Sequence, residues 1–205
     1  EYLRGFHFTG DIYAIPEGTV VFPREPLLKV VAPVMEAQLV ETAILNMINH
    51  QSLIATKAAR VVYAARGDGI MEFGLRRAQG PDAGIYGARA ALIGGCIGTS
   101  NVLTGKMFGV PVKGTHAHSW IMSFPDEYTA FKTYAELYPN ACILLVDTYD
   151  VLDSGVPNAI RVFKEMKEKD PGFKNYGIRI DSGDLAYLSK EAYKMLDTAG
   201  FGDAV

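Results

Sequence analysis

The sequence has few cysteines, little excess charge and no long apolar run. Its two cysteines, Cys96 and Cys142, have no Cys or His partner at metal-ligand spacing, which excludes a disulfide framework and favours a reducing, cytoplasmic setting. The 20 basic and 23 acidic side chains sum to −3, which excludes a strongly basic face for nucleic acid. The longest apolar runs, such as 141–146, are too short to cross a bilayer, so we expect no membrane partner.

Apolar residues make up 49% of the 205 positions and charged residues 21%, which supplies ample material for a folded core. This length corresponds to one large domain, or to one domain plus part of another. The chain opens without Met and stops just after a predicted helix. We therefore expect a piece of a longer protein, truncated at both ends.

Residues 1–33 have the pattern of a small β-rich unit. Turn signals at 10–11, 16–18 and 23–26 separate three short strand-like segments at 12–14, 19–22 and 27–31. We assign 1–33 to part of a β-rich N-terminal domain.

From residue 34 the apolar period becomes helical, and the pattern predicts a long amphipathic helix over about 34–60. Strands and helices then alternate, which predicts parallel βαβ units. No dinucleotide-type glycine fingerprint follows the first strand, so we assign 34–205 to a partial (β/α) barrel rather than a Rossmann sheet. We predict strands at 70–75, 97–100, 110–113, 142–146 and 178–180. After the long helix we predict helices at 82–93, 154–169 and 184–198, a further helix that ends near residue 108, and another that follows Pro125.

In such a barrel the chemistry lies at the carboxyl ends of the strands, and the unusual polar residues of this chain fall there. Phe73, Arg76 and Arg77 follow the first barrel strand, where the arginines suit phosphate or carboxylate and the ring suits stacking. A solvated arginine pair and a core phenylalanine are the alternative. Ser100 lies in a small polar segment that opens a helix, which suits either an anion or an ordinary helix cap.

Two of the four histidines lie close together in the segment GTHAHSW at 114–120. A histidine at a strand end can act as a base or a phosphoryl acceptor, or it can be structural. No Asp, Glu or Cys lies close enough in sequence to suggest a zinc site.

Charged residues also end the next two strands. Asp147 closes the apolar run 142–146 and requires a cation, an arginine or a hydroxyl as partner if it is buried. Ser154 fits the N-cap of the helix that follows. Arg179 and Asp181 share one face of their strand, opposite the isoleucines, and so predict a functional pair in the barrel mouth.

Five segments in series resemble the nicotinate phosphoribosyltransferase family of type II phosphoribosyltransferases. They are EFGLRRAQG at 72–80, GTSNV at 98–102, GTHAHSW at 114–120, LLVDTYD at 144–150 and IRIDSGDL at 178–185. The resemblance covers essentially the whole chain. It implies formation of nicotinate mononucleotide and pyrophosphate from nicotinate and phosphoribosyl pyrophosphate, coupled to ATP hydrolysis. It further implies cytosolic NAD salvage, dependence on Mg²⁺, and a homodimer.

The resemblance also implies roles for individual residues. Arg179 and Thr115 would bind nicotinate and Phe73 would lie against its ring, while His118 would be phosphorylated by ATP. Asp147 and Asp181 would orient Arg179, the ribose or Mg²⁺. The resemblance implies anionic ligands for Arg76, Arg77 and Ser100, and it gives no role to His116 and no set of metal ligands.

Two alternatives stay open from the sequence. One is another type II phosphoribosyltransferase, for nicotinamide or quinolinate. The other is a non-catalytic fragment or assembly module.

Overall fold

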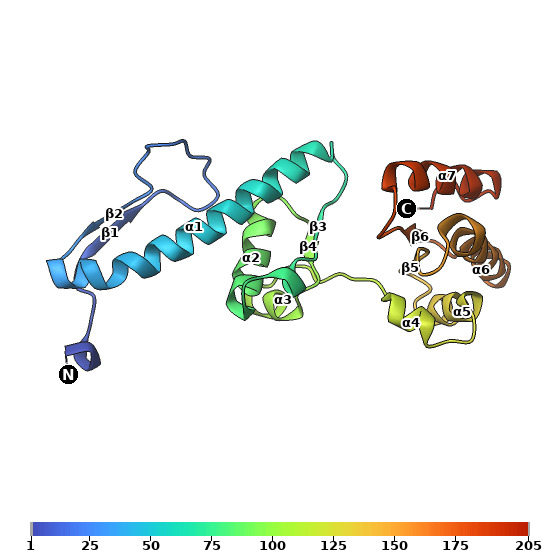
Figure 1. Ribbon diagram of the computed structural model, residues 1–205, viewed down its shortest axis with the longest axis horizontal. Coiled ribbons are helices and arrows are strands. Elements are labelled where there is room, and N and C mark those ends of the chain that lie inside the picture. Colours follow the sequence, from blue (N-terminus) through green and yellow to red (C-terminus); the bar gives the residue numbers. More distant parts are fainter. Residues whose placement is uncertain (1, 205) are drawn as a thin grey trace. The chain divides into compact units, whose positions relative to one another are not determined.

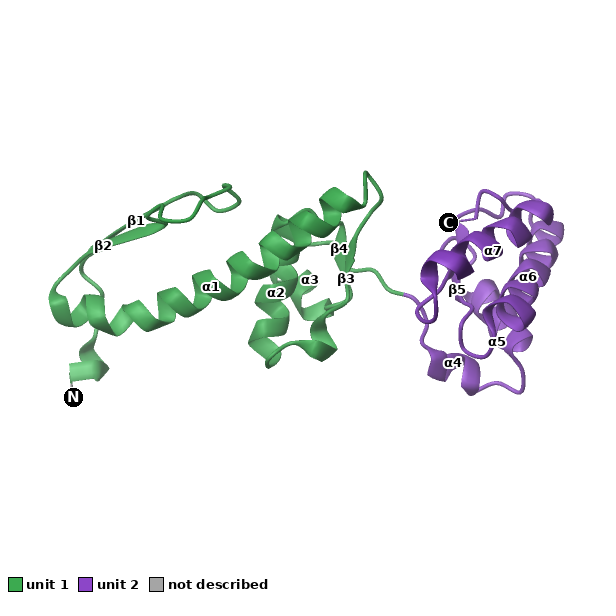
Figure 2. Ribbon diagram, turned by 45° about the horizontal axis from the view of Figure 1, so that its top comes forward, with its two compact units in different colours: residues 1–114 green, residues 115–205 purple. Residues whose placement is uncertain are grey.

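The computed structural model describes residues 2–204, and the chain forms two compact units, 1–114 and 115–205 (Figure 2). Each unit has α-helices packed beside short strands (Figure 1). The strands of the described residues form three two-stranded sheets, one antiparallel and two parallel. The predicted mixed α/β class is therefore confirmed. The boundary at residue 33 stays a prediction.

The first unit opens with a 3-10 turn, Tyr2–Gly5, and an antiparallel hairpin of β1 (Asp11–Ala14) and β2 (Leu28–Val31). The strands predicted at 12–14 and 27–31 are confirmed. The strand predicted at 19–22 is wrong, because this segment lies in the loop between β1 and β2. Its Val20 side chain is 80% exposed, so the apolar run has neither a strand partner nor a core to cover it.

The long helix α1 (Val34–Ala64) begins directly after Pro33 and extends slightly beyond its predicted end. It packs against α2 (Pro81–Ile93), whose first turn holds Pro81. Ala58, Ala91 and Cys96 form a small buried cluster where the two helices meet. Close helix packing there depends on Gly94, because an added Cβ would lie 2.6 Å from the Ala55 carbonyl oxygen of α1.

Helix α2 connects two short parallel strands, β3 (Met71–Glu72) and β4 (Gly98–Thr99). Helix α3 (Val102–Phe108) follows β4, and the Asn101 side chain accepts a hydrogen bond from the Thr104 amide at its N-terminus. The strand predicted at 110–113 is reduced to a single parallel bridge between Val112 and Thr99.

The second unit contains α4 (His118–Met122), α5 (Glu127–Leu137), β5 (Cys142–Leu145), α6 (Val156–Lys169), β6 (Tyr176–Arg179) and α7 (Leu185–Thr198). Strands β5 and β6 are parallel, with Leu145 opposite Arg179, and α6 connects them. Their apolar side chains pack with the helices into one core that includes Phe131, Leu144 and Phe163. The predicted βαβ unit is confirmed, and α4 was not predicted.

The start of α6 differs from the sequence prediction. A π-helical turn, Val151–Gly155, precedes the helix, and the Asp150 side chain caps this turn by accepting hydrogen bonds from the Leu152 and Asp153 amides. Ser154 is therefore not the N-cap. Its hydroxyl donates instead to the buried carboxylate of Glu127 at 2.5 Å, which joins the turn to α5.

Within residues 2–204, no helix combines the length and the apolar character needed to span a membrane.

Candidate functional site

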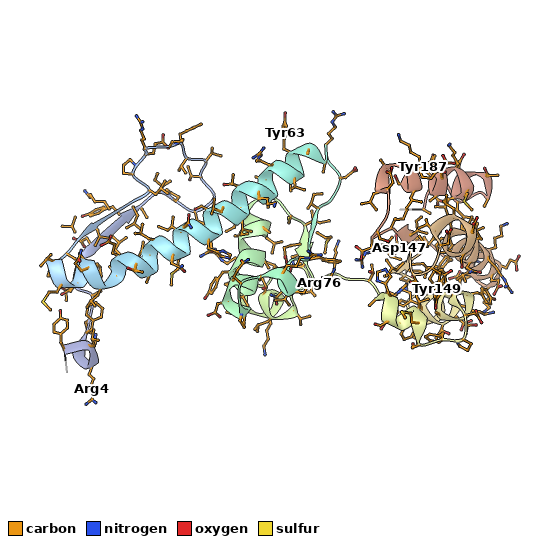
Figure 3. All side chains as sticks on the ribbon, in the orientation of Figure 1. Arg4, Tyr63, Arg76, Asp147, Tyr149 and Tyr187 are labelled. Carbon is orange, nitrogen blue, oxygen red and sulfur yellow. The ribbon has the colours of Figure 1, made fainter. Side chains whose placement is uncertain are left out.

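Asp147 lies at the centre of a polar cluster in the second unit, two positions after the end of β5 (Asp147 is labelled in Figure 3). Its Oδ1 is 3.1 Å from His118 Nε2. Its Oδ2 accepts hydrogen bonds from the Asp181 amide at 3.0 Å and from the Ser182 hydroxyl at 2.5 Å. The side chain of Asp147 is only 1% exposed, and these donors are the partners that such burial requires.

The environment of Asp147 keeps the carboxylate ionised. Burial acts to raise its pKa, but the hydrogen bonds from Ser182, the Asp181 amide and His118 together outweigh burial and hold the pKa below its ordinary value. Asp147 is therefore a fixed anion that accepts from His118. Since the His118 side chain is 41% exposed, the opposite edge of its ring can meet a ligand.

Arg179, the last residue of β6, is held from two sides. Its Nη1 donates to Thr115 Oγ1 at 2.7 Å, and its Nη2 lies 3.1 Å from Asp181 Oδ1. The guanidinium is 28% exposed and Asp181 is 38% exposed, so both face accessible space. A guanidinium fixed in this way suits a planar anion such as a carboxylate.

The strands explain why these residues meet. β5 and β6 are adjacent and parallel, so their carboxyl ends lie at one edge of the sheet. Asp147 follows β5 by two positions and Asp181 follows β6 by two positions, which brings the Asp181 amide to the Asp147 carboxylate. The segment 115–118 reaches the same edge from a distant part of the sequence through Thr115 and His118.

The remaining candidates belong to the first unit. Phe73 follows β3, Arg76 and Arg77 lie in a 3-10 turn, Leu75–Arg77, and Ser100 follows β4 (Arg76 is labelled in Figure 3). Since β3 and β4 are adjacent and parallel, these residues leave the sheet at one edge. Glu72 and Thr99 join the two strand ends, because the Thr99 hydroxyl donates to Glu72 Oε2 at 2.6 Å.

The structure thus gathers the predicted residues into one group in each unit. Asp147, Asp181, Arg179, Thr115 and His118 are linked by hydrogen bonds and an ion pair. Phe73, Arg76, Arg77 and Ser100 share a sheet edge in the other unit.

Two further residues contact this group or its strand, and the sequence does not single them out. The sequence predicts a cation, an arginine or a hydroxyl as partner for Asp147, but it does not identify Ser182 as the hydroxyl. His116 received no role, yet it is buried and accepts a hydrogen bond from the Leu145 amide. Neither partner is local in sequence, so no spacing pattern indicated these bonds.

A wide, mainly apolar groove of about 880 Å³ also lies in the first unit, between the loop after β1, α1 and α2. None of the candidate residues lines it. The candidate polar residues of that unit and this groove are therefore separate features.

Comparison with known proteins gives the same assignment along most of the chain. Residues 1–49 match the nicotinate phosphoribosyltransferase N-terminal domain, and residues 69–200 match the nicotinate phosphoribosyltransferase family. The second match contains all the candidate residues of both groups.

Individual relatives agree. A nicotinate phosphoribosyltransferase from Bacillus subtilis is 58% identical over 192 residues, covering 94% of this chain and 38% of the relative. The crystal structure of human nicotinic acid phosphoribosyltransferase superposes with a TM-score of 0.87 at 35% identity, covering 97% of this chain and 49% of that one. The crystal structure of a nicotinate-nucleotide pyrophosphorylase from Pyrococcus furiosus gives a TM-score of 0.81 at 31% identity, covering 95% of this chain and 49% of that one.

The chain spans less than half the length of these relatives. Over that span, the family match, the identities and the superposition all agree with the motifs that end its strands. On these grounds the chain belongs to the nicotinate phosphoribosyltransferase family.

Proposed function

We propose that this chain carries part of the active site of an enzyme that makes nicotinate mononucleotide. The reaction joins nicotinate to phosphoribosyl pyrophosphate and releases pyrophosphate, while ATP and water become ADP and phosphate. Family membership supports this proposal, and the relatives bear the corresponding names.

The observation that carries the proposal is the fixed guanidinium of Arg179. Thr115 and Asp181 hold it at 2.7 Å and 3.1 Å, so its orientation is set before a ligand arrives. Nicotinate differs from nicotinamide by a carboxylate, and a guanidinium pairs with a carboxylate through two parallel hydrogen bonds. Arg179 is therefore the residue that selects the acid over the amide.

His118 is the phosphoryl acceptor in this proposal. Its Nε2 bonds to the Asp147 carboxylate, so the neutral ring carries its proton on Nε2 and its lone pair on Nδ1. Nδ1 attacks the γ-phosphorus of ATP, the N–P bond forms and the bond to ADP breaks. The resulting ring is cationic and Asp147 stabilises it until water cleaves the N–P bond and releases phosphate.

Nucleotide formation requires mainly orientation and charge stabilisation. The pyridine nitrogen of nicotinate attacks C1 of the ribose, the C–O bond to pyrophosphate breaks, and positive charge develops on the sugar. We assign Phe73 to the pyridine ring, and Arg76, Arg77 and Ser100 to the anionic groups of the substrates. Their position after β3 and β4 supports this assignment.

The proposal includes Mg²⁺, which balances the charge of the pyrophosphate. Among the described residues, no three His, Cys, Asp or Glu side chains lie together as a metal site. Mg²⁺ in phosphate-binding sites usually takes one or two carboxylates and fills its shell with phosphate oxygens and water, which these residues fit. Asp181 is the carboxylate we assign, because it is 38% exposed whereas Asp147 is 1% exposed and already accepts three hydrogen bonds.

The proposal also covers the fold, the compartment and the oligomeric state. The two parallel βαβ units support a (β/α) barrel in the complete catalytic domain. The two free cysteines support a cytoplasmic location, and membership of the family supports a homodimer.

The test is product formation by the intact gene product. We expect nicotinate mononucleotide from nicotinate and phosphoribosyl pyrophosphate, with a higher rate when ATP and Mg²⁺ are present and little product from nicotinamide. Product from nicotinamide or quinolinate instead would assign the chain to another type II phosphoribosyltransferase. No product from any of the three acceptors would favour a non-catalytic role.

A further inference from the structure

His116 is the buried member of the segment that joins the polar cluster to β5. It is 9% exposed, although Thr115 and His118 on either side of it are partly exposed. Its ring packs edge-on against Tyr134 of α5, with the ring centroids 4.6 Å apart. A histidine enclosed in this way needs a polar partner, and it has one in β5.

The partner of His116 is the backbone amide of Leu145, which donates to Nε2 at 3.2 Å. β5 bonds to β6 through the next amide, since Val146 donates to the Arg179 carbonyl oxygen at 3.0 Å. Alternate amides of a strand point to opposite edges, so the Leu145 amide faces away from β6. The His116 ring therefore supplies the acceptor at the edge of β5 that β6 does not cover.

This bond is the middle one of three that hold residues 115–118. Thr115 bonds to Arg179 on one side of it, and His118 bonds to Asp147 on the other. The two outer bonds start from the partly exposed side chains of Thr115 and His118, and each is lost if the segment shifts along the sheet edge. The His116 bond is buried and ends on the backbone of β5, so it fixes the segment to the strand.

We propose that His116 is a positioning residue whose ring docks residues 115–118 on β5 and so places Thr115 beside Arg179 and His118 beside Asp147. The effect on catalysis rests on the proposed function of these residues. The docking itself does not.

The docking bond requires an unprotonated Nε2, and the surroundings of His116 keep it so. The pKa of His116 is lowered to about 4, and burial of the ring is the main cause. The backbone of Ala117 acts to raise the pKa, and the positive charge of Arg179 acts to lower it. Tyr134 is the titratable group that faces the ring from α5. At neutral pH the ring is therefore an acceptor at Nε2, with its proton on Nδ1.

The test compares two variants in the intact gene product. His116→Gln places an amide oxygen at the same number of bonds from the backbone as Nε2, whereas His116→Leu keeps the bulk and removes the acceptor. Val162→Ala, in the buried face of α6 and outside the segment, is a matched control for loss of stability. All proteins are assayed well below the lowest melting temperature of the set.

We expect His116→Leu to lower kcat/KM for nicotinate by about tenfold or more, because misplacement of a catalytic group by a fraction of an ångström is costly. His116→Gln should recover most of this loss, and Val162→Ala should keep the wild-type value. Wild-type activity in His116→Leu would overturn the proposal. So would an equal loss in Val162→Ala, or no recovery in a folded His116→Gln.

A second measurement separates the docking from the reaction. Nitrogen-15 NMR of the histidine rings should show His116 neutral with an unprotonated Nε2 in the wild type. The His118 resonances should move in His116→Leu and stay near the wild-type positions in His116→Gln. If the wild type makes no nucleotide, the proposed function fails while this result still decides the docking. Unmoved His118 resonances in His116→Leu would overturn it.

Discussion

Replacing Asp147 by Asn exchanges a carboxylate for an amide of nearly the same shape, and the geometry predicts how the amide must sit. The Asp181 backbone amide can only donate, so the Asn oxygen has to face it, on the side that also meets Ser182. The NH₂ group then faces His118 Nε2, at the position where Oδ1 now lies 3.1 Å away. His118 must accept there, which moves its proton to Nδ1 and removes the lone pair that would attack ATP.

The size of the effect follows from the same contacts. Hydrogen bonds to a charged group contribute about 1.5–3 kcal/mol each, against about 0.5–1.5 kcal/mol for neutral ones. The amide oxygen keeps neutral versions of the two bonds from the Asp181 amide and Ser182, so for these two bonds we expect Asp147→Asn to lose about 2–3 kcal/mol of unfolding free energy. The wrong tautomer should lower kcat far more, by on the order of 10²-fold or greater, as in other sites where a carboxylate orients a histidine.

The assay combines urea unfolding, ATP-dependent nucleotide synthesis and nitrogen-15 NMR of His118 in the intact gene product. Ser182→Ala is the matched control, because it removes one donor to Asp147 while leaving the carboxylate and the His118 tautomer in place. It should lose stability with a smaller loss of kcat. If Asp147→Asn stays folded, keeps Nε2 of His118 protonated and turns over at the wild-type rate, the reasoning is refuted.

Three further predictions follow from the same contacts. Arg179→Ala should shrink the ratio of kcat/KM for nicotinate to kcat/KM for nicotinamide by about tenfold to a hundredfold, because a charge-assisted contact of about 1.5–3 kcal/mol is lost. Arg179→Lys should recover part of the ratio, since lysine restores the charge but lacks the two parallel N–H donors of the guanidinium. An unchanged ratio would make Arg76 or Arg77 the carboxylate-binding candidate. His118→Ala should abolish acid-labile label from radiolabelled ATP while Ser119→Ala, at an exposed position, retains it, and equal labelling would contradict the assignment. The pKa of His116 falls from 6.5 in the unfolded chain to about 4 in the folded one, so the unfolded chain takes up the proton first as the pH drops. The protein should therefore lose about 3 kcal/mol of unfolding free energy between pH 6.5 and pH 4, while this contribution is fully present above pH 6.5. Urea curves for wild type and His116→Gln that change in parallel over this range would refute the prediction.

The sequence alone predicted the elements whose signals are local. The apolar period and the absence of Gly and Pro predicted α1 to within a few residues. Pro157 marked the first turn of α6, and Gly200 marked the end of α7. The ends of the strands were marked by abrupt changes from apolar to polar residues. These changes placed Asp147 and Arg179 at the correct edge of β5 and β6.

Strand extent was less predictable, because a strand exists only where another strand bonds to it. The apolar segment 19–22 has strand-forming residues but no partner, and β3 and β4 pair over two residues each. A helix bonds to itself, so its extent can be estimated from the local sequence. A strand's extent depends on residues that are distant in the chain.

The contacts within the site were decided by tertiary structure alone. Arg179 meets Thr115 across 64 positions, and His116 meets Leu145 across 29. Sequence showed that a buried carboxylate at 147 needed partners, since an unpaired buried charge is too costly to retain. Only the fold decided that those partners are His118, Ser182 and the Asp181 amide, because it brings two parallel strand ends and the segment 115–118 to one edge.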